Sequence, residues 1–166
     1  MSEISFFVAG LPQTQAGMRD VPTKNGGRAL ITTGGKDLKP WRKKVKQVAE
    51  LAKRNTPTLT GPVEVTYRFV LPMPSTRPVA LRRQGIDWSY SKPDLDKLAR
   101  AIGDSLSDAA VYGDDGQIAR SVIAKVVVHD RSLCGVEVVV RQIPDTDDTR
   151  AYLLALLERR RSMLRG

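Results

Sequence analysis

The segment from Leu95 to Ala109 most constrains how this chain can fold. Its apolar residues recur every three or four positions and fall within one arc of about 100° on a helical wheel. The opposite side of the wheel carries charged residues spaced four apart, at Asp96, Arg100, Asp104 and Asp108. This pattern predicts an amphipathic helix whose apolar side must pack against another layer of secondary structure.

Segments with strand character on both sides of this helix can supply that layer. Val63–Leu71 alternates apolar and polar residues, which predicts a half-buried strand. Ser5–Ala9 predicts a short first strand. Ile118–His129 and Val136–Ile143 are rich in β-branched residues and are separated by a turn, so we expect these two strands to form a hairpin.

Two more helices complete the predicted elements. Leu38–Arg54 has apolar residues at helical spacing and basic residues around its other faces, with Trp41 expected as a core or interface anchor. Arg150–Leu164 is predicted as a last helix, capped by one of residues 147–149. We therefore expect a single domain over residues 1–166, of the α+β class, with a small mixed sheet of about four strands packed by two to three helices.

The charge and the composition narrow the function. A net charge of +9 and a pI near 10.0 favour a polyanionic partner, nucleic acid first, although a basic surface can also serve solubility alone. Cys134 and His129 are the only residues of their kinds, which nearly excludes disulfide frameworks, Cys/His zinc sites and catalysis by a Cys–His or Ser–His pair within one chain. No apolar run approaches the roughly 20 residues of a membrane span, and Met1–Gly10 lacks a signal-peptide pattern, so we expect a cytoplasmic protein that does not enter a membrane.

The acidic residues are concentrated in one part of this basic chain. Between Ser91 and Arg120, four basic residues face six acidic ones, a net charge of −2, so the remainder carries +11. Clustered carboxylates would repel the phosphates that the rest of the protein attracts, unless a bound cation reverses their local sign. The charge distribution therefore indicates a metal site within a nucleic-acid-binding protein.

Two short motifs in this acidic stretch could supply the ligands. Asp94 and Asp96 flank the predicted helix start, where Pro93 disfavours helix at the preceding residue. Asp114 and Asp115 lie in the turn after the helix. Carboxylate oxygens suit Mg²⁺ or Mn²⁺. The alternatives are structural: Asp96 as a helix cap, Arg100 with Asp104 as a helical ion pair, and the Asp-Asp-Gly sequence as a turn.

Three consecutive motifs resemble the core of the RusA-type crossover junction endodeoxyribonucleases of bacteria and phages. They are Lys92-Pro93-Asp94-Leu95-Asp96-Lys97-Leu98, Ile102-Gly103-Asp104-Ser105-Leu106 and Val111-Tyr112-Gly113-Asp114-Asp115-Gly116-Gln117-Ile118. The resemblance covers roughly Lys92 to Lys125 in detail. It implies a RusA-like fold, a homodimer, no organic cofactor, and Mg²⁺-dependent resolution of four-way (Holliday) junctions by paired symmetric nicks, in DNA recombination, DNA repair or phage DNA processing.

The resemblance also assigns roles to individual residues. The metal-binding acids of the family fall on Asp94, Asp96 and Asp115, with Asp114 adjacent, and Mn²⁺ is expected to substitute for Mg²⁺. The catalytic lysine of the family falls on Arg100, and its usual Asn after the second Asp is Lys97 here. Arginine stabilises phosphate charge but is a poor proton donor, so Lys97 is an alternative for that role.

Basic residues outside the acidic stretch are the expected DNA contacts. They lie in the Gln13–Asp37 segment, expected to be an exposed mobile loop, in the basic helix, and in the Pro72–Lys92 segment, expected to be an active-site flap. The residues are Arg19, Lys24, Arg28, Lys43, Lys46, Arg77, Arg82, Arg83 and Lys92. Trp88 and Tyr90 of the flap either stack on an unpaired base or pin the flap to the core.

Two other functions remain open at this point. The chain could be a non-catalytic nucleic-acid-binding protein in which the acids only cap helices and form turns. It could also be a general nuclease that acts on flaps or forks. A divalent-metal requirement separates the first alternative from a junction resolvase, and matched DNA substrates separate the second.

Overall fold

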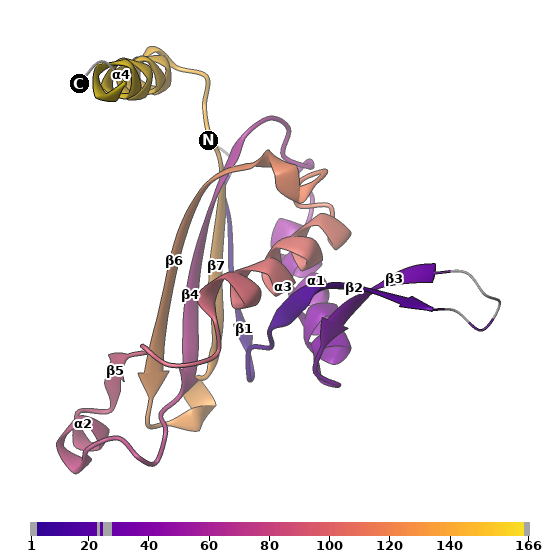
Figure 1. Ribbon diagram of the computed structural model, residues 1–166, viewed down its shortest axis with the longest axis vertical. Helices are drawn as coiled ribbons and strands as arrows, with labels where there is room; N and C mark the ends of the chain where they lie inside the picture. The colour runs from indigo at the N-terminus through magenta and orange to yellow at the C-terminus, as the bar shows by residue number, and fades with distance from the viewer. Residues whose placement is uncertain (1–2, 23, 25–27, 165–166) are drawn as a thin grey trace.

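The fold is described by a computed structural model that covers residues 3–22, 24 and 28–164 (Figure 1). A five-stranded mixed sheet carries two α helices on one face, and a separate two-stranded hairpin lies beside those helices. In chain order the elements are β1 Glu3–Ala9, β2 Gln15–Pro22, β3 Arg28–Gly34, α1 Leu38–Lys53, β4 Val63–Pro72, α2 Val79–Gln84, β5 Ile86–Trp88, α3 Leu95–Asp108, the 3-10 turn η1 Asp115–Gln117, β6 Ile118–Val128, the 3-10 turn η2 Arg131–Leu133, β7 Gly135–Gln142 and α4 Asp147–Met163. The predicted α+β class is confirmed, with five rather than about four strands in the main sheet.

The order of strands in the main sheet is β1-β7-β4-β6-β5, and only the central pair β4–β6 is parallel. The predicted hairpin of Ile118–His129 with Val136–Ile143 is therefore wrong. Tyr67 at the middle of β4 lies between Ile123 of β6 and Val138 of β7. The turn between the last two strands is real, but it crosses the end of β4 instead of closing a ladder.

The alternation in Val63–Leu71 predicts the buried face correctly. Val63, Val65, Tyr67, Phe69 and Leu71 are all buried, on the face that the helices cover. The helix α3 faces this strand with Leu98, Ile102 and Leu106, each fully buried. At about 25 cal/mol per Å² of apolar surface removed from water, such contacts supply most of the driving force for folding.

The helix α1 packs beside α3 and over β1. Trp41 is 5% exposed and belongs to the core, which confirms the anchor role expected for it. The basic side chains of this helix lie toward solvent, while Val45 and Ala49 are buried.

Two segments expected to be irregular contain regular structure. Gln13–Asp37 was predicted as a loop, but β2 and β3 form an antiparallel hairpin there. Pro72–Lys92 was predicted as a flap, and it holds the short helix α2 and the strand β5, which pairs with the end of β6. Strands without clear alternation of apolar and polar residues, such as β2 and β3, and elements as short as β5 leave little trace in a sequence, which is why they were missed.

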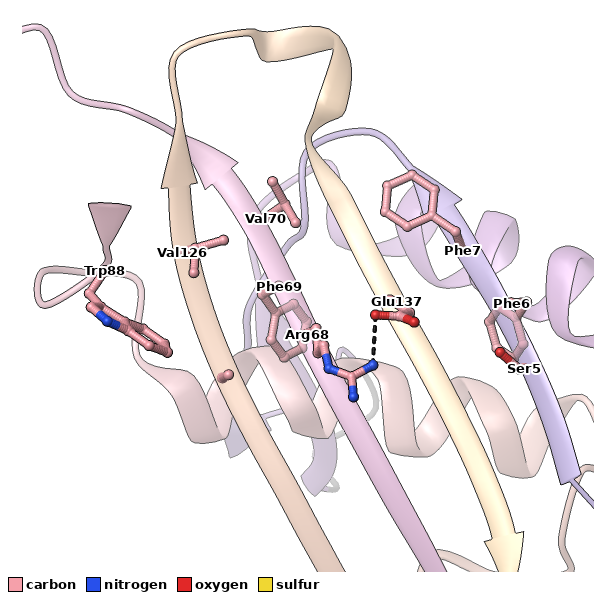
Figure 2. A pocket seen from close by; sticks show the side chains of 10 residues that line it. Ser5, Phe6, Phe7, Arg68, Phe69, Val70, Trp88, Val126 and Glu137 are labelled. Carbon is pink, nitrogen blue, oxygen red and sulfur yellow. Dashed lines mark hydrogen bonds and ion pairs between the residues drawn. The ribbon is translucent and has the colours of Figure 1, made fainter. Parts of the chain in front are cut away.

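The face of the sheet opposite α1 and α3 is not covered by a helix in the described part of the chain (Figure 1). Its charged residues pair with one another: Arg68 with Glu137 at 2.8 Å, Arg141 with Glu3 at 2.5 Å, and Arg120 with Glu64. A hollow of about 610 Å³ lies beside the first pair, lined by apolar residues that include Phe7, Val70, Trp88 and Val126 (Figure 2). This face thus combines apolar residues with charged residues that pair with one another.

The last helix, α4, projects from the body of the molecule beyond one end of the sheet (Figure 1). It starts earlier than expected, because the Thr146 side chain accepts a hydrogen bond from the Thr149 backbone N–H at 3.3 Å and acts as the cap. The residues predicted as caps, 147–149, are the first turn of the helix instead. None of the described helices is long and apolar enough to cross a membrane.

Candidate active site

The loop that leads into α3 is held in place from strand β6. The Nζ of Lys125 on β6 donates hydrogen bonds to the backbone carbonyls of Ser91, at 2.5 Å, and Pro93, at 2.7 Å. Asp94, in an extended conformation, is the N-cap residue of α3. Asp96, named above as a possible cap, therefore lies in the first helical turn and is exposed.

A shallow hollow of about 280 Å³ lies between α3, the turn before β6, and the sheet. Asp96 and Arg100 line it from α3, Asp115 lines it from η1, and Tyr67 and Ser121 line it from β4 and β6. Asp96, Arg100 and Gly103 are spaced four and three apart, so α3 presents them on one side. The structure thus brings together Asp96, Arg100 and Asp115, which the sequence had placed in two separate motifs.

Asp94 is not among the residues that line this hollow. Its carboxylate accepts a hydrogen bond from Lys97 Nζ at 2.6 Å. That hydrogen bond, with the charge of Lys97 behind it, lowers the pKa of Asp94, and the same contact raises the pKa of Lys97. Both side chains are more than two-fifths exposed, so the pair is a weak one that another cation could exchange.

The three-acid metal site expected from the resemblance is not assembled here. Within residues 3–22, 24 and 28–164, no group of three or more His, Cys, Asp or Glu side chains lies close enough to hold a metal ion. Asp94 is paired with Lys97 and does not line the hollow that Asp96 and Asp115 share. The donor set still fits a hard cation, because Asp96 and Asp115 share the hollow and Asp94 already accepts a positive charge.

Asp114 has a structural role, unlike Asp115, which lines the hollow. Its carboxylate accepts a hydrogen bond from the Gly116 backbone N–H at 2.8 Å, and Gln117 Oε1 accepts in turn from the Asp114 N–H at 3.2 Å. This capping box stabilises η1. Asp114 therefore shapes the turn that directs Asp115 into the hollow.

Two buried tyrosines lie at the hollow, although neither was predicted as a site residue: Tyr67 lines it, and Tyr112 contacts Gly103, which also lines it. Burial, and then the negative charge of Asp115, raise the pKa of Tyr67 well above its usual range. Burial also raises the pKa of Tyr112, whose hydroxyl donates to the Gly103 carbonyl at 3.0 Å. Both hydroxyls stay protonated at neutral pH and are polar groups beneath an acidic site. The alternation of β4 predicted Tyr67 as a core residue, and only the folded register places it against Asp115.

The other acids of α3 have structural partners. Asp104 accepts a hydrogen bond from the Gln15 side chain of β2 and lies 3.5 Å from Arg42. Asp108 pairs with Arg42 at 2.7 Å. The expected Arg100–Asp104 ion pair is therefore replaced by contacts of Asp104 with α1 and β2, which leaves Arg100 in the hollow.

The comparison with protein families decides the assignment. The family described as endodeoxyribonuclease RusA matches residues 12–141, most of the chain and all of the hollow. The chain belongs to the RusA endodeoxyribonuclease family. No curated protein matches the sequence significantly. RusA nucleases cut DNA, act on branched substrates and generally depend on divalent metals.

The basic residues expected to contact DNA differ in how exposed their side chains are. Lys24, Arg28, Lys43, Arg83 and Lys92 are exposed. Lys46 is half-buried and pairs with Glu50 at 3.6 Å, and Arg82 is half-buried. The side chain of Arg19 lies outside the described part of the structure.

Arg77, predicted as a phosphate contact, has a structural environment instead. It is 7% exposed, lies 3.3 Å from Asp87 and donates to the Trp88 carbonyl at 3.2 Å. Its guanidinium also stacks 3.9 Å from the ring centre of Tyr90. Arg77 therefore pins the segment between β4 and α3, and it supports the view that Tyr90 fixes this segment to the fold.

Lys125 is a residue that the sequence did not single out, and its replacement is our first prediction. Lys125→Met removes both hydrogen bonds to the loop before Asp94, so we expect cleavage to fall roughly tenfold to a hundredfold, since small displacements of reacting groups have such effects. The measurement is the single-turnover cleavage rate, with circular dichroism to follow folding. The matched control is Lys44→Met, because Lys44 donates similarly to the Ala9 carbonyl at 2.6 Å, away from the hollow. Equal losses in both variants would contradict a positioning role.

Proposed function

We propose that this chain resolves four-way DNA junctions by metal-dependent hydrolysis of phosphodiester bonds, with paired symmetric nicks. One observation carries the proposal: Asp96, Arg100 and Asp115 line a common hollow in a chain that belongs to the RusA family. Two acids and one permanent cation at an open surface suit a phosphodiester, which needs both a metal site and a partner for its charge. DNA recombination, DNA repair and phage DNA processing are the settings in which four-way junctions arise.

The metal would be held by Asp96 and Asp115, with Asp94 joining them when Lys97 releases it. Mg²⁺ is the proposed ion and Mn²⁺ the expected substitute, because both prefer oxygen ligands. When bound, such an ion lowers the pKa of a bound water and polarises a phosphoryl oxygen. Asp114 is not proposed as a metal ligand, because its carboxylate already caps η1.

Basic residues of the chain would stabilise the phosphate and contact the DNA backbone. Arg100 lies in the hollow with the two acids, where its guanidinium can offset charge that develops on the phosphate. Lys97 would be free of Asp94 if Asp94 held a metal ion, and its ammonium group would then be available to the DNA backbone. Lys92 and Arg83 are exposed and would contact phosphates, and such contacts set the register of the DNA without reading its sequence.

The arginine at position 100 gives a second prediction. Arg100→Ala should lower the cleavage rate roughly tenfold to a thousandfold, because a preorganised donor at the phosphate is lost. Arg100→Lys, the residue usual in the family, should keep most of the rate if the role is electrostatic. Rates measured over a pH series test this, since only a proton-transfer role would give the lysine variant a new dependence on pH. A full loss in Arg100→Lys would show that the bidentate guanidinium itself is required.

Symmetric cuts in a four-way junction require two active sites related by a two-fold axis, so we propose that the working form is a homodimer. Within the described residues, the uncovered sheet face with its balanced charges and the exposed helix α4 are surfaces on which two copies would associate.

The deciding experiment compares labelled four-way, flap and duplex DNA of matched sequence, with Mg²⁺, with Mn²⁺ and with a chelator. Paired nicks at symmetric positions of the four-way junction, dependent on the metal, are the expected result. Cleavage of flaps at an equal rate would identify a general structure-selective nuclease. Junction binding without any metal-dependent cut would identify a non-catalytic binding protein.

A further inference from the structure

The position of the Asp115 carboxylate depends on the backbone of the turn that carries it. The side chain of Asp115 is exposed and makes no hydrogen bond or ion pair with the described residues, although it lines the hollow. The turn, residues 113–116, lies between the end of α3 and the start of β6. Whatever fixes the backbone of this turn therefore also fixes where the carboxylate lies.

The side-chain amide of Gln117 joins this turn to the loop before β4. Its Oε1 accepts hydrogen bonds from the backbone N–H groups of Gly113, at 2.7 Å, and Asp114, at 3.2 Å. Its Nε2 donates to the backbone carbonyls of Leu59, at 3.3 Å, and Gly61, at 2.8 Å. A primary amide has two lone pairs on its oxygen and two N–H groups, so Gln117 uses its full hydrogen-bonding capacity.

The loop that Gln117 reaches is itself fixed to the core. Leu59 is 4% exposed and belongs to the hydrophobic core, and its N–H donates to the Val111 carbonyl at 2.9 Å. Leu59 also forms an isolated parallel bridge with Tyr112. Gly61 has a φ of +77°, a left-handed conformation that favours glycine. The two carbonyls that accept from Gln117 thus belong to a segment anchored in the core.

The residue before the turn is anchored as well. Tyr112 is fully buried, and its hydroxyl donates to the carbonyl of Gly103, a residue of α3 that lines the hollow. Gly113 leaves room for the amide, because a Cβ at this position would lie 3.1 Å from Gln117 Oε1. The turn that carries Asp115 therefore has Tyr112 fixed on one side and the amide of Gln117 on the other.

A local cap does not require this arrangement. In a capping box the side chain at the third position only accepts from the backbone N–H of the N-cap residue, which glutamate does as well as glutamine. The two hydrogen bonds that Nε2 donates reach 56 and 58 positions back in the sequence and add nothing to the cap. They require an amide N–H, which a glutamate side chain lacks.

We propose that Gln117 is a positioning residue for the metal site, and that its amide holds the turn to the loop before β4 so that Asp115 lies within reach of an ion bound by Asp96. The inference rests on the proposed function, because it takes these two acids as metal ligands. Mg²⁺ requires nearly ideal ligand geometry, so a turn that is not held in place would weaken the site. Gln117 itself is not a ligand, since its oxygen and nitrogen already bind the backbone.

The first test measures metal binding by the full chain without DNA. The protein is titrated with Mn²⁺ alone, and the electron paramagnetic resonance signal of the free ion gives the dissociation constant. Gln117→Glu should raise this constant at least about tenfold, because groups that orient metal ligands have effects of this size. The added negative charge would by itself strengthen metal binding, so charge cannot explain a weaker affinity. Gln117→Met, which removes the acceptor as well, should also raise the constant at least about tenfold.

The matched control is Thr58→Val. The Oγ1 of Thr58 donates to the Ala110 carbonyl at 2.9 Å, so this residue ties the same loop to the segment after α3 but not to residues 113–116. Its replacement should lower the midpoint of thermal unfolding, as the Gln117 variants should, and should leave the affinity for Mn²⁺ unchanged. Thermal unfolding of all variants therefore separates stability from positioning.

The metal dependence of cleavage gives a second readout. In Gln117→Glu, the Mn²⁺ concentration that gives half of the maximal rate on a four-way junction should rise at least about tenfold. The rate at saturating Mn²⁺ should fall by a smaller factor, because a bound ion itself holds the two acids together. A loss confined to the saturating rate would contradict a role in forming the metal site.

The remaining outcomes separate this inference from the proposed function. If the wild type binds Mn²⁺, Asp96→Asn does not, and both Gln117 variants bind as the wild type does, the positioning role is overturned and the metal site stands. A wild type that binds no Mn²⁺, with or without a junction, overturns both. A loss in Gln117→Met but not in Gln117→Glu would make Gln117 a local cap only, and an equal loss in Thr58→Val would mean that any loosening of the loop has this effect.

Discussion

Asp96→Asn is expected to lower cleavage of a four-way junction by roughly 10²- to 10³-fold, because a neutral amide replaces a carboxylate at the place proposed for the metal. The side chain of Asp96 is exposed, and it makes no hydrogen bond or ion pair with the described residues. The substitution preserves shape, so the free energy of unfolding should change by no more than about 0.5 kcal/mol. Binding of the junction without metal should persist or strengthen, since one negative charge near the phosphates is lost.

The matched control for Asp96→Asn is Asp108→Asn, three turns farther along the same helix. Asp108 is 54% exposed at its side chain and pairs with Arg42 at the surface, so its loss should leave cleavage nearly unchanged. The measurements are single-turnover rates in Mg²⁺, binding in a chelator, and thermal unfolding of both variants. An Asp96→Asn protein that cuts at the wild-type rate would contradict the proposed metal site. An equal loss of cleavage in Asp108→Asn would mean that the overall negative charge of α3, and not the hollow, determines the rate.

The elements nearest the candidate site were the most predictable from the sequence. Helix α3 was expected at Leu95–Ala109 and runs from Leu95 to Asp108, because its apolar spacing admits only one face toward a core. The alternation of β4 likewise fixes which residues are buried. These periodicities depend only on residues close together in the sequence, so they can be recognised without knowing the fold.

Contacts between distant parts of the chain were not predictable in the same way. A turn between two strands normally indicates a hairpin, yet β4 lies between β6 and β7. Two β-branched strands carry no mark of which neighbour they pair with, because the parallel β4–β6 ladder and an antiparallel hairpin suit the same residues. Lys125 and Tyr67 were missed for the same reason: their roles depend on which strand passes beside α3.

The acidic residues of the candidate site were predictable from the sequence only in part. The resemblance named Asp94, Asp96 and Asp115 together, and the structure places two of them at the hollow and pairs the third with Lys97. A motif records which residues a family uses, whereas the ion pair of Asp94 with Lys97 depends on how the two side chains lie in the folded chain. Arg77 is the opposite case, because its charge suggested DNA while its burial against Asp87 and Tyr90 gives it a structural contact.

The second large effect is expected from the packing that supports this arrangement. Leu106 is fully buried in the face of α3 that contacts the sheet. Leu106→Ala should lower the free energy of unfolding by about 3 kcal/mol, within the range of 2–5 kcal/mol typical of buried leucines, because it removes apolar contacts and leaves a cavity. For a chain of this length that corresponds to a fall in Tm of about 6–12 °C. Differential scanning calorimetry measures the change.

Leu154→Ala is the matched control for Leu106→Ala. Leu154 is 61% exposed on α4, so its truncation should change the free energy of unfolding by less than about 0.5 kcal/mol. Because Leu106 lies on the same helix as Asp96 and Arg100, its loss should also lower cleavage at temperatures where the protein remains folded, as α3 shifts toward the cavity. A large loss of stability with unchanged cleavage at low temperature would show instead that the hollow keeps its geometry without tight packing of α3, and that its acids are positioned chiefly by Lys125 and η1.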